Sequence, residues 1–144
     1  MHIVIPIKVV PDDQDIQIAA DRTLDFSKCH HIVSTYDLNA LEAAAQLASR
    51  CGATTTAISI GCAAIDDSKL KKNVLSRGID DFVLVADDAY ADLDARATAA
   101  TLADCIAALG DVDLVVCGDG SADNYAQQTD VQLAAKLGLP VVTG

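Results

Sequence analysis

The stretch VDLVVCGDGSADNYAQQTDVQLAAKLG, residues 112–138, predicts a strand, a loop of small residues and a helix. Its valine-rich run at 114–117 is typical of a strand buried on both faces. The loop that follows, 118–121, contains two glycines, which allow a tight turn and a close approach of a ligand to the backbone. From about Asn124 the apolar residues recur at helical spacing, and Gly138 is placed to end the helix.

A loop of this kind lies at the carboxyl end of a parallel strand, where open α/β sheets bind ligands. Backbone N–H groups and the start of a helix favour an anion there. The loop contains no lysine or arginine, but it offers neutral donors and acceptors, namely Ser121, Asn124, Gln127, Gln128 and Thr129. A phosphate would therefore be held by N–H and hydroxyl groups, unlike in a Walker-type site. The alternative is an ordinary strand–helix turn with capping residues.

The composition favours helices packed on a buried sheet. Hydrophobic residues make up 51% of the 144 residues, only 3% are aromatic, and there is no tryptophan. A chain of this length is expected to form a single domain, 1–144, with enough residues for a core. The net charge of −11 argues against nucleic acid or an anionic membrane surface as a partner.

The five cysteines are odd in number and scattered, without a Cys-x-x-Cys pair, so zinc and iron–sulfur sites are not expected. Reduced, buried thiols in a cytoplasmic protein are the simplest interpretation. The apolar start of the chain is too short for a signal peptide, and no apolar run approaches the roughly 20 residues that span a membrane. We therefore expect a cytoplasmic protein without direct membrane insertion.

The rest of the chain alternates strands with helices, which predicts an open, mostly parallel, doubly wound Rossmann-like α/β sheet with helices on both faces. Pro6 interrupts the first strand and indicates a strand end. Asp37 is placed to cap the first helix. Residues 9–33 form a long connection, and long loops often carry function. The expected strands are 2–8, 54–60, 81–85, 114–117 and 140–143, with a short one at 16–19, and the expected helices are 37–51, 66–77, 95–109 and 124–138.

Two other groups of residues contain residue types that are typical of functional sites. The Cys-His-His run at 29–31 contains metal-ligand types, but adjacent side chains in an extended chain point to opposite faces, which favours an ordinary loop. Asp12, Asp13 and Asp87 are similar to the acidic pocket of a phospho-acceptor receiver domain, but the lysine that such a domain needs after its fifth strand is absent from 142–144. No serine or cysteine lies in a nucleophile elbow. The residues alone favour an adenine-nucleotide-binding domain without catalytic side chains.

Five motifs are spread along the chain: IPIK at 5–8, LDFSK at 24–28, YDLNALEAA at 36–44, VLSRG at 74–78 and CGDGSADNYAQQT at 117–129. With them, the chain resembles the β subunits of electron transfer flavoproteins, particularly their bacterial Fix-type branch. The last motif is the most specific, because it matches the nucleotide loop of that family position by position.

The resemblance implies a heterodimer. An α subunit would make most of the contacts to a redox-active FAD, and this chain would bury an AMP, or a second FAD as in electron-bifurcating members. The pair would carry electrons from dehydrogenases to a downstream acceptor. The nucleotide-binding residues that the resemblance implies are Pro6, Ser34, Thr35, Tyr36, Asp37, Ile60, Gly118, Asp119, Gly120, Ser121, Ala122, Asp123, Asn124, Tyr125, Ala126, Gln127, Gln128 and Thr129. Tyr36 would pack against an adenine or flavin ring.

Two departures from the family pattern bear on this interpretation. Family members continue past the position of Gly144, so the resemblance implies a truncated chain, and an exposed sheet edge beyond Val142 would favour self-association. The turn at 10–13 has no aromatic residue, where some members place one near the redox flavin. The alternative function is a stand-alone adenine-nucleotide-binding module similar to universal stress proteins, whose phosphate loop fits 118–121 only loosely.

Overall fold

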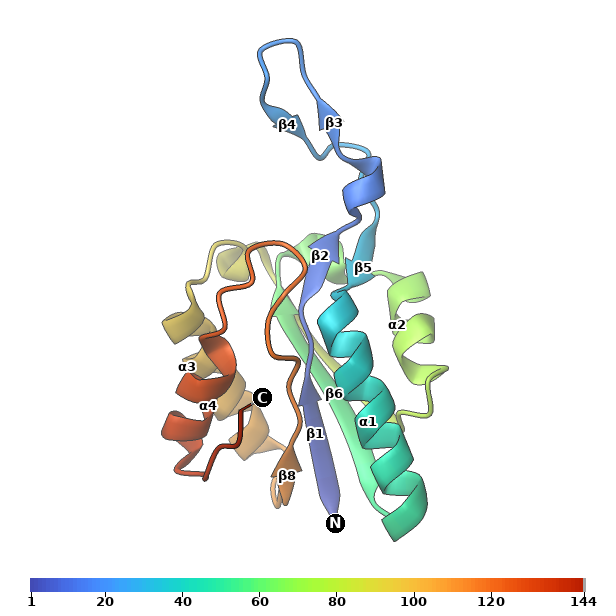
Figure 1. The fold of residues 1–144 in the computed structure, drawn as a ribbon, viewed down its shortest axis with the longest axis vertical. Helices are drawn as coiled ribbons and strands as arrows, with labels where there is room; N and C mark the ends of the chain where they lie inside the picture. Colours follow the sequence, from blue (N-terminus) through green and yellow to red (C-terminus); the bar gives the residue numbers. More distant parts are fainter. Residues whose placement is uncertain (144) are drawn as a thin grey trace.

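A parallel sheet forms the framework of the fold (Figure 1). The computed structural model describes residues 1–143, and Gly144 lies outside the described residues. The sheet has four strands in the order β7-β6-β1-β8. Their bounds are His2–Pro6 for β1, Thr54–Gly61 for β6, Asp81–Ala86 for β7 and Leu114–Val115 for β8. The chain thus extends the sheet from β1 in one direction and then crosses back to place β8 on the other side of β1.

The central position of β1 follows from its apolar residues. Ile3, Val4 and Ile5 are fully buried, as expected for a parallel strand with both faces covered. Ile3 pairs with Thr55 of β6 on one side and with Leu114 of β8 on the other. Each apolar side chain of this size contributes roughly 1.5–3 kcal/mol when fully buried.

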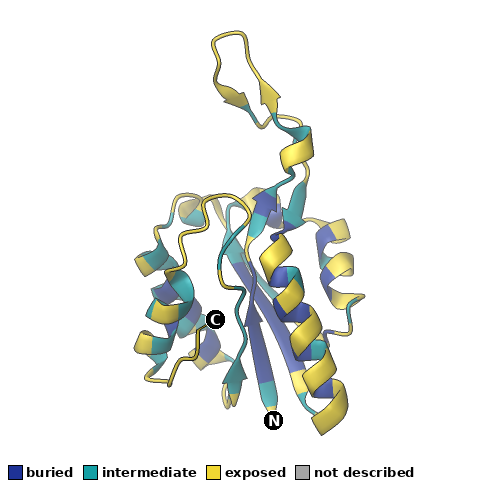
Figure 2. Cartoon of the chain, viewed as in Figure 1, coloured by how far each residue is buried: buried dark blue, intermediate teal, exposed yellow. Residues whose placement is uncertain are grey.

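Helices cover both faces of the sheet, which confirms the predicted α/β class (Figures 1 and 2). The bounds of the helices are Thr35–Cys51 for α1, Ser68–Leu75 for α2, Ala95–Ala108 for α3 and Thr129–Leu137 for α4. The sheet divides the core into two clusters. One cluster gathers Ile3, Ile5, Leu41, Ala44 and Val74, and the other gathers Val4, Ile58, Leu102, Ile106 and Leu133. No helix within residues 1–143 is long and apolar enough to cross a membrane.

Two expectations about the last third of the chain are wrong. α4 begins at Thr129 and not near Asn124, because Tyr125 and Gln127 have φ angles of 45° and 51°, outside the right-handed helical region. No strand forms at 140–143, where the residues are exposed. The open edge of the sheet on this side is therefore β8, and the self-association expected from an open edge stays a prediction.

Other boundaries differ by a few residues. β1 ends at Pro6, earlier than expected, while α2 ends at Leu75. α1 begins at Thr35, so Ser34 occupies the N-cap position that the sequence assigned to Asp37. Asp37 therefore lies inside the first turn of α1, where its carboxylate is available to other segments.

The long connection after β1 forms an arm, residues 9–33, which extends beyond the carboxyl end of the sheet (Figure 1). Near the sheet, two antiparallel strands pair, and a second pair follows further out. These are β2 (Val9–Pro11) with β5 (His31–Val33), and β3 (Gln17–Ile18) with β4 (Leu24–Asp25). The outer part of the arm is largely exposed (Figure 2).

Candidate nucleotide-binding site

Three segments meet at the carboxyl ends of β1 and β8. They are residues 6–8, 34–37 and 118–125, and hydrogen bonds connect them. The strand order reverses here, because β6 and β7 lie on one side of β1 and β8 lies on the other. Open α/β sheets bind ligands at such a switch point.

Pro6 lies where its missing N–H breaks no ladder hydrogen bond. The carbonyl groups of His2 and Val4 accept hydrogen bonds from the N–H groups of Asp113 and Val116, both at 3.0 Å. Alternate residues of a parallel strand bond to the same neighbour, so Pro6 faces the side on which β8 has already ended. This position explains how a proline is tolerated in a central strand.

Asp37 joins the end of β1 to the loop after β8. Its side chain is only 5% exposed, and its Oδ2 accepts a hydrogen bond from the Lys8 N–H at 2.6 Å. The backbone N–H of Gly118 also favours the charged form of this carboxylate. Burial raises the pKa of Asp37 from 3.8 to about 6, although both N–H groups oppose that rise. The carboxylate thus holds two segments outside its own helix, where a cap was expected.

Gly118 and Gly120 are required for different reasons. A Cβ on Gly118 would overlap the Asp37 carboxylate and would lie 3.0 Å from the carbonyl carbon of Tyr36. A Cβ on Gly120 would instead overlap the ring of Tyr125, which is an exposed side chain. Gly118 is therefore needed to fold the loop against α1, whereas Gly120 leaves room above the loop for a movable ring.

Lys8 is a candidate that the sequence reasoning missed. Its Nζ donates a hydrogen bond to Asp123 Oδ2 at 2.5 Å, which brings a cation to a loop that has none of its own. Partial burial raises the pKa of Asp123, but the hydrogen bond and charge of Lys8, together with the Asn124 N–H, outweigh burial and bring that pKa to about 2. The available signal was the position of Lys8 just after a strand that ends at Pro6, at the same sheet edge as the loop.

Side-chain contacts close the outer part of the loop. The rings of Tyr36 and Tyr125 lie 4.9 Å apart, centroid to centroid, and are tilted by 45°. The Tyr125 hydroxyl donates to Asp119 at 2.5 Å, and this hydrogen bond raises the pKa of Tyr125. The Ser121 hydroxyl donates to Asn124 at 2.9 Å. Tyr36 packs on another tyrosine here, so its contact with a nucleotide ring stays a prediction.

The structure brings together some of the predicted residues and separates others. The Ala122 N–H donates to the hydroxyl of Ser34, which is fully buried, at 3.2 Å. Thr35 is exposed at the start of α1. Ile60 packs with the cluster under α3 and α4, on the opposite face of the sheet from α1. Residues 126–128 are exposed, and Thr129 begins α4.

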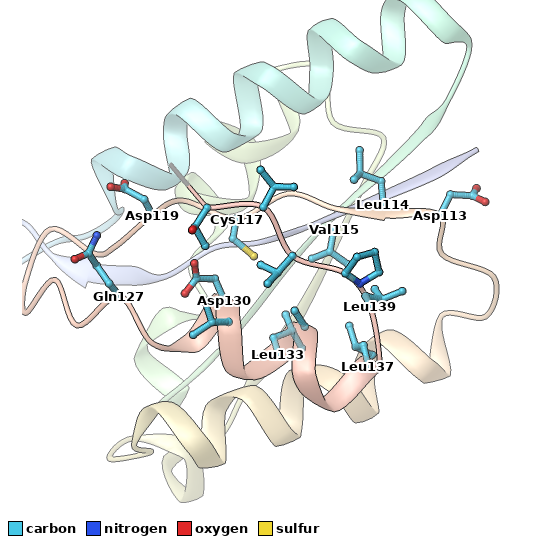
Figure 3. A pocket seen from close by; sticks show the side chains of 16 residues that line it. Asp113, Leu114, Val115, Cys117, Asp119, Gln127, Asp130, Leu133, Leu137 and Leu139 are labelled. Atoms are coloured by element: carbon cyan, nitrogen blue, oxygen red, sulfur yellow. The ribbon is translucent and has the colours of Figure 1, made fainter.

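A groove of about 620 Å³ lies between β8, α4 and residues 139–143 (Figure 3). Of the predicted site residues, only Asp119 and Gln127 line it. Asp113 and Asp130 also line it, and none of its lining residues is a lysine or arginine. Such a surface repels a phosphate. A phosphate is therefore expected on the other side of the loop, where Lys8 lies.

Cys117 lines the same groove but is not a reactive thiol. Burial, together with the charges of Asp130 and Asp37, raises the pKa of Cys117 to about 12. The thiolate is the nucleophilic form of cysteine, and it is therefore negligible at neutral pH. This cysteine acts as a small apolar residue beneath the loop.

The Lys8 side of the loop combines a cation with acids that already have partners. The Asp37 carboxylate packs on Gly118 and the exposed Tyr125 ring packs on Gly120, while the Lys8 ammonium reaches the loop at Asp123. The acids nearby already have partners: backbone N–H groups for Asp37, the Tyr125 hydroxyl for Asp119 and Lys8 for Asp123. Their negative charge is therefore partly compensated, which lowers the electrostatic cost of a phosphate.

The fold and this loop define the chain as a Rossmann-like α/β protein with its candidate site at the switch point of the sheet. A family model described as the electron transfer flavoprotein domain matches residues 23–144. That match covers most of the chain, and the chain belongs to the electron transfer flavoprotein family. Proteins of this family carry electrons between other redox proteins by means of a flavin.

Proposed function

We propose that this chain is the β subunit of an electron transfer flavoprotein of the Fix-type branch. It binds AMP or a second FAD and forms a heterodimer with an α subunit. The heterodimer accepts electrons from dehydrogenases and delivers them to a downstream acceptor in the cytoplasm. Residues 1–144 act as a single nucleotide-binding domain. The observation that carries this proposal is the anchoring of the specific loop motif on Asp37, Ser34 and Lys8, at the sheet's switch point.

In this proposal the chain positions a nucleotide and contributes no catalytic side chain. The loop N–H groups from Gly118 onward and the Lys8 ammonium hold the phosphate. The hydroxyl of Ser121 and the amide of Asn124 orient the sugar or phosphate oxygens, and Tyr36 flanks the ring. When FAD is bound, it supplies the redox chemistry, while the protein supplies orientation and electrostatics.

The first test identifies the bound molecule. The chain is purified alone and denatured, and the released small molecules are analysed by mass spectrometry. AMP supports a structural nucleotide, and FAD supports a second flavin of the bifurcating type. If neither is released, and neither AMP nor FAD binds to the refolded chain, the proposed site is wrong.

The second test places the site in the loop. Gly120→Val should abolish nucleotide retention and leave the sheet folded, because the atoms nearest to the added Cβ belong to the exposed ring of Tyr125. Ala89→Val changes an exposed residue in the connection after β7 and serves as the matched control. Unchanged retention in Gly120→Val would move the site elsewhere. Circular dichroism checks that both variants fold.

A further inference from the structure

The outer hairpin of the arm, residues 16–26, carries an apolar face that consists of Ile16, Ile18, Leu24 and Phe26. Ile18 lies directly opposite Leu24 in the antiparallel ladder. Opposite residues of such a ladder share a face, and so do residues two positions apart. Ile16 and Phe26 therefore extend the face formed by Ile18 and Leu24, while Gln17 and Asp25 occupy the other face.

This apolar face is exposed to an unusual degree. Ile18 is 75% exposed, Leu24 56% and Phe26 48%. The hairpin projects past the end of the sheet, away from the helices that cover the core (Figures 1 and 2). A two-stranded hairpin is only marginally stable by itself and needs a packed face to become independent. The sequence thus places three large apolar side chains in exposed positions, with the half-buried Ile16 at the base of the same face, which is typical of an interaction surface.

The charge around this face is negative. Residues 12–28 contain five aspartates but only two basic residues, Arg22 and Lys28. Hydrogen bonds from Thr23 lower the pKa of Asp21, and hydrogen bonds from Ser27 lower the pKa of Asp25. These carboxylates therefore stay ionised at neutral pH, and they place negative charge in the turn of the hairpin, at Asp21, and on the face opposite the apolar one, at Asp25.

The negative charge of the hairpin indicates which kind of partner can bind to its apolar face. A second copy would bring two acidic arms together on molecules that each carry a net charge of −11, so it is disfavoured. An anionic membrane is repelled for the same reason. A complementary protein surface has an apolar centre edged by lysine or arginine. Permanent interfaces are the more hydrophobic class, so a constant partner accounts for this exposed face better than a transient one.

We infer that the apolar face of the outer hairpin packs against the partner subunit of the heterodimer, on an apolar surface edged by basic side chains. This inference rests on the proposed function, which supplies the partner. The outer hairpin thus forms a contact surface separate from the nucleotide loop, and the paired strands β2 and β5 connect this hairpin to the sheet.

The test uses the chain together with the α subunit encoded in the same genome. The variant Ile18→Ser, Leu24→Ser, Phe26→Ser should weaken the heterodimer by roughly 100-fold or more, because central apolar contacts dominate interfaces. Leu47→Ser and Leu75→Ser change leucines of α1 and α2 that are also partly exposed, and they should leave the affinity unchanged. Hydrogen exchange of the amides of residues 17–25 should slow when the α subunit is added.

Each outcome decides the inference. Loss of affinity in the triple variant, with unchanged folding and unchanged nucleotide content, supports it. Wild-type affinity in the triple variant overturns the inference and leaves the heterodimer intact. If the wild-type chain does not bind the α subunit at all, the heterodimer and this inference both fail. A wild-type homodimer that the triple variant converts to a monomer assigns the face to a second copy and overturns the inference.

Discussion

The two halves of the loop between β8 and α4 differ sharply in how they are held. Gly118 packs on Asp37, Ala122 bonds to Ser34, and Asp123 pairs with Lys8. The half from Asn124 to Gln128 is exposed and contains both left-handed residues of the loop. The first half is thus joined to β1 and α1 by hydrogen bonds, whereas the second half holds an unfavourable backbone conformation and contacts α1 through the Tyr125 ring. A ligand that bonds to the exposed residues 126–128 would add contacts to this half.

The largest effect is expected in the first half of the loop. Gly118→Val should lower the free energy of unfolding by about 3 kcal/mol, because its side chain overlaps backbone and a buried carboxylate. Gly138→Ala has nothing within 4 Å of the new Cβ but a φ of 65°, and it should lose only about 1 kcal/mol. Urea unfolding measures both. Equal losses would show that α1 and the Asp37 carboxylate shift to admit the new side chain, so that the close approach at Gly118 is not required.

Asp37 should make the stability depend on pH. Its folded pKa of about 6 lies above its usual value of 3.8, so between these values the folded state binds more protons than the unfolded state. The contribution of neutral Asp37 is complete below about pH 3.8 and is lost as the pH rises to 6, a loss of about 2–3 kcal/mol.

Asp37→Asn should remove this part of the pH dependence, as measured by urea unfolding at several pH values. Asp104→Asn, at an exposed position on α3, controls for the loss of one negative charge. If the slope between pH 4 and 6 is the same in wild type and Asp37→Asn, the carboxylate is not buried as described.

A smaller effect is expected where the first half meets β1. Lys8→Met removes the ion pair with Asp123 and should cost about 0.5–1 kcal/mol, since both side chains are partly exposed. Nucleotide retention should also fall, because the loop loses its cation. Lys71→Met removes the ion pair between Lys71 of α2 and Asp66, which precedes that helix, and serves as the control. Retention that falls equally in both variants would mean that net charge, and not the position of Lys8, is responsible.

The smallest effect is expected in the second half. Gln127→Asn should stabilise the chain by about 0.5 kcal/mol, because asparagine tolerates the left-handed region better than glutamine does. Gln132→Asn, inside α4, should have the opposite sign because asparagine is the poorer helix former. Thermal unfolding of the two variants compares them directly. A destabilised Gln127→Asn would indicate that the glutamine side chain makes contacts that outweigh the strain.

The sequence predicted those features that depend on local pattern. Alternating strands and amphipathic helices gave the α/β class, and Gly138 ended α4 in a left-handed conformation as expected. The predicted start of α4 was wrong because Tyr125 and Gln127 adopt a left-handed backbone. Glycine or asparagine would have indicated such a conformation in the sequence, whereas tyrosine and glutamine do not. The strand expected at 140–143 did not form, since apolar residues alone do not specify a strand without a paired neighbour.

The sequence predicted where the candidate site lies, but not the hydrogen bonds that connect its residues. The two glycines and the strand–loop–helix order located the loop at the sheet edge. The roles of Asp37 and Lys8 depend on hydrogen bonds across 29 and 115 positions of sequence, which no local pattern encodes. An aspartate near the start of a helix looks the same in the sequence whether it caps that helix or, like Asp37, is buried against two other segments.

Lys8 connects the arm, residues 9–33, to the loop between β8 and α4. Its N–H bonds to Asp37, its carbonyl accepts from Ser34, and its ammonium reaches the loop. The next residue, Val9, begins the arm. If the proposed partner binds the arm and the proposed nucleotide binds the loop, both bind segments that meet at Lys8, and we expect each to change the affinity for the other by the same factor.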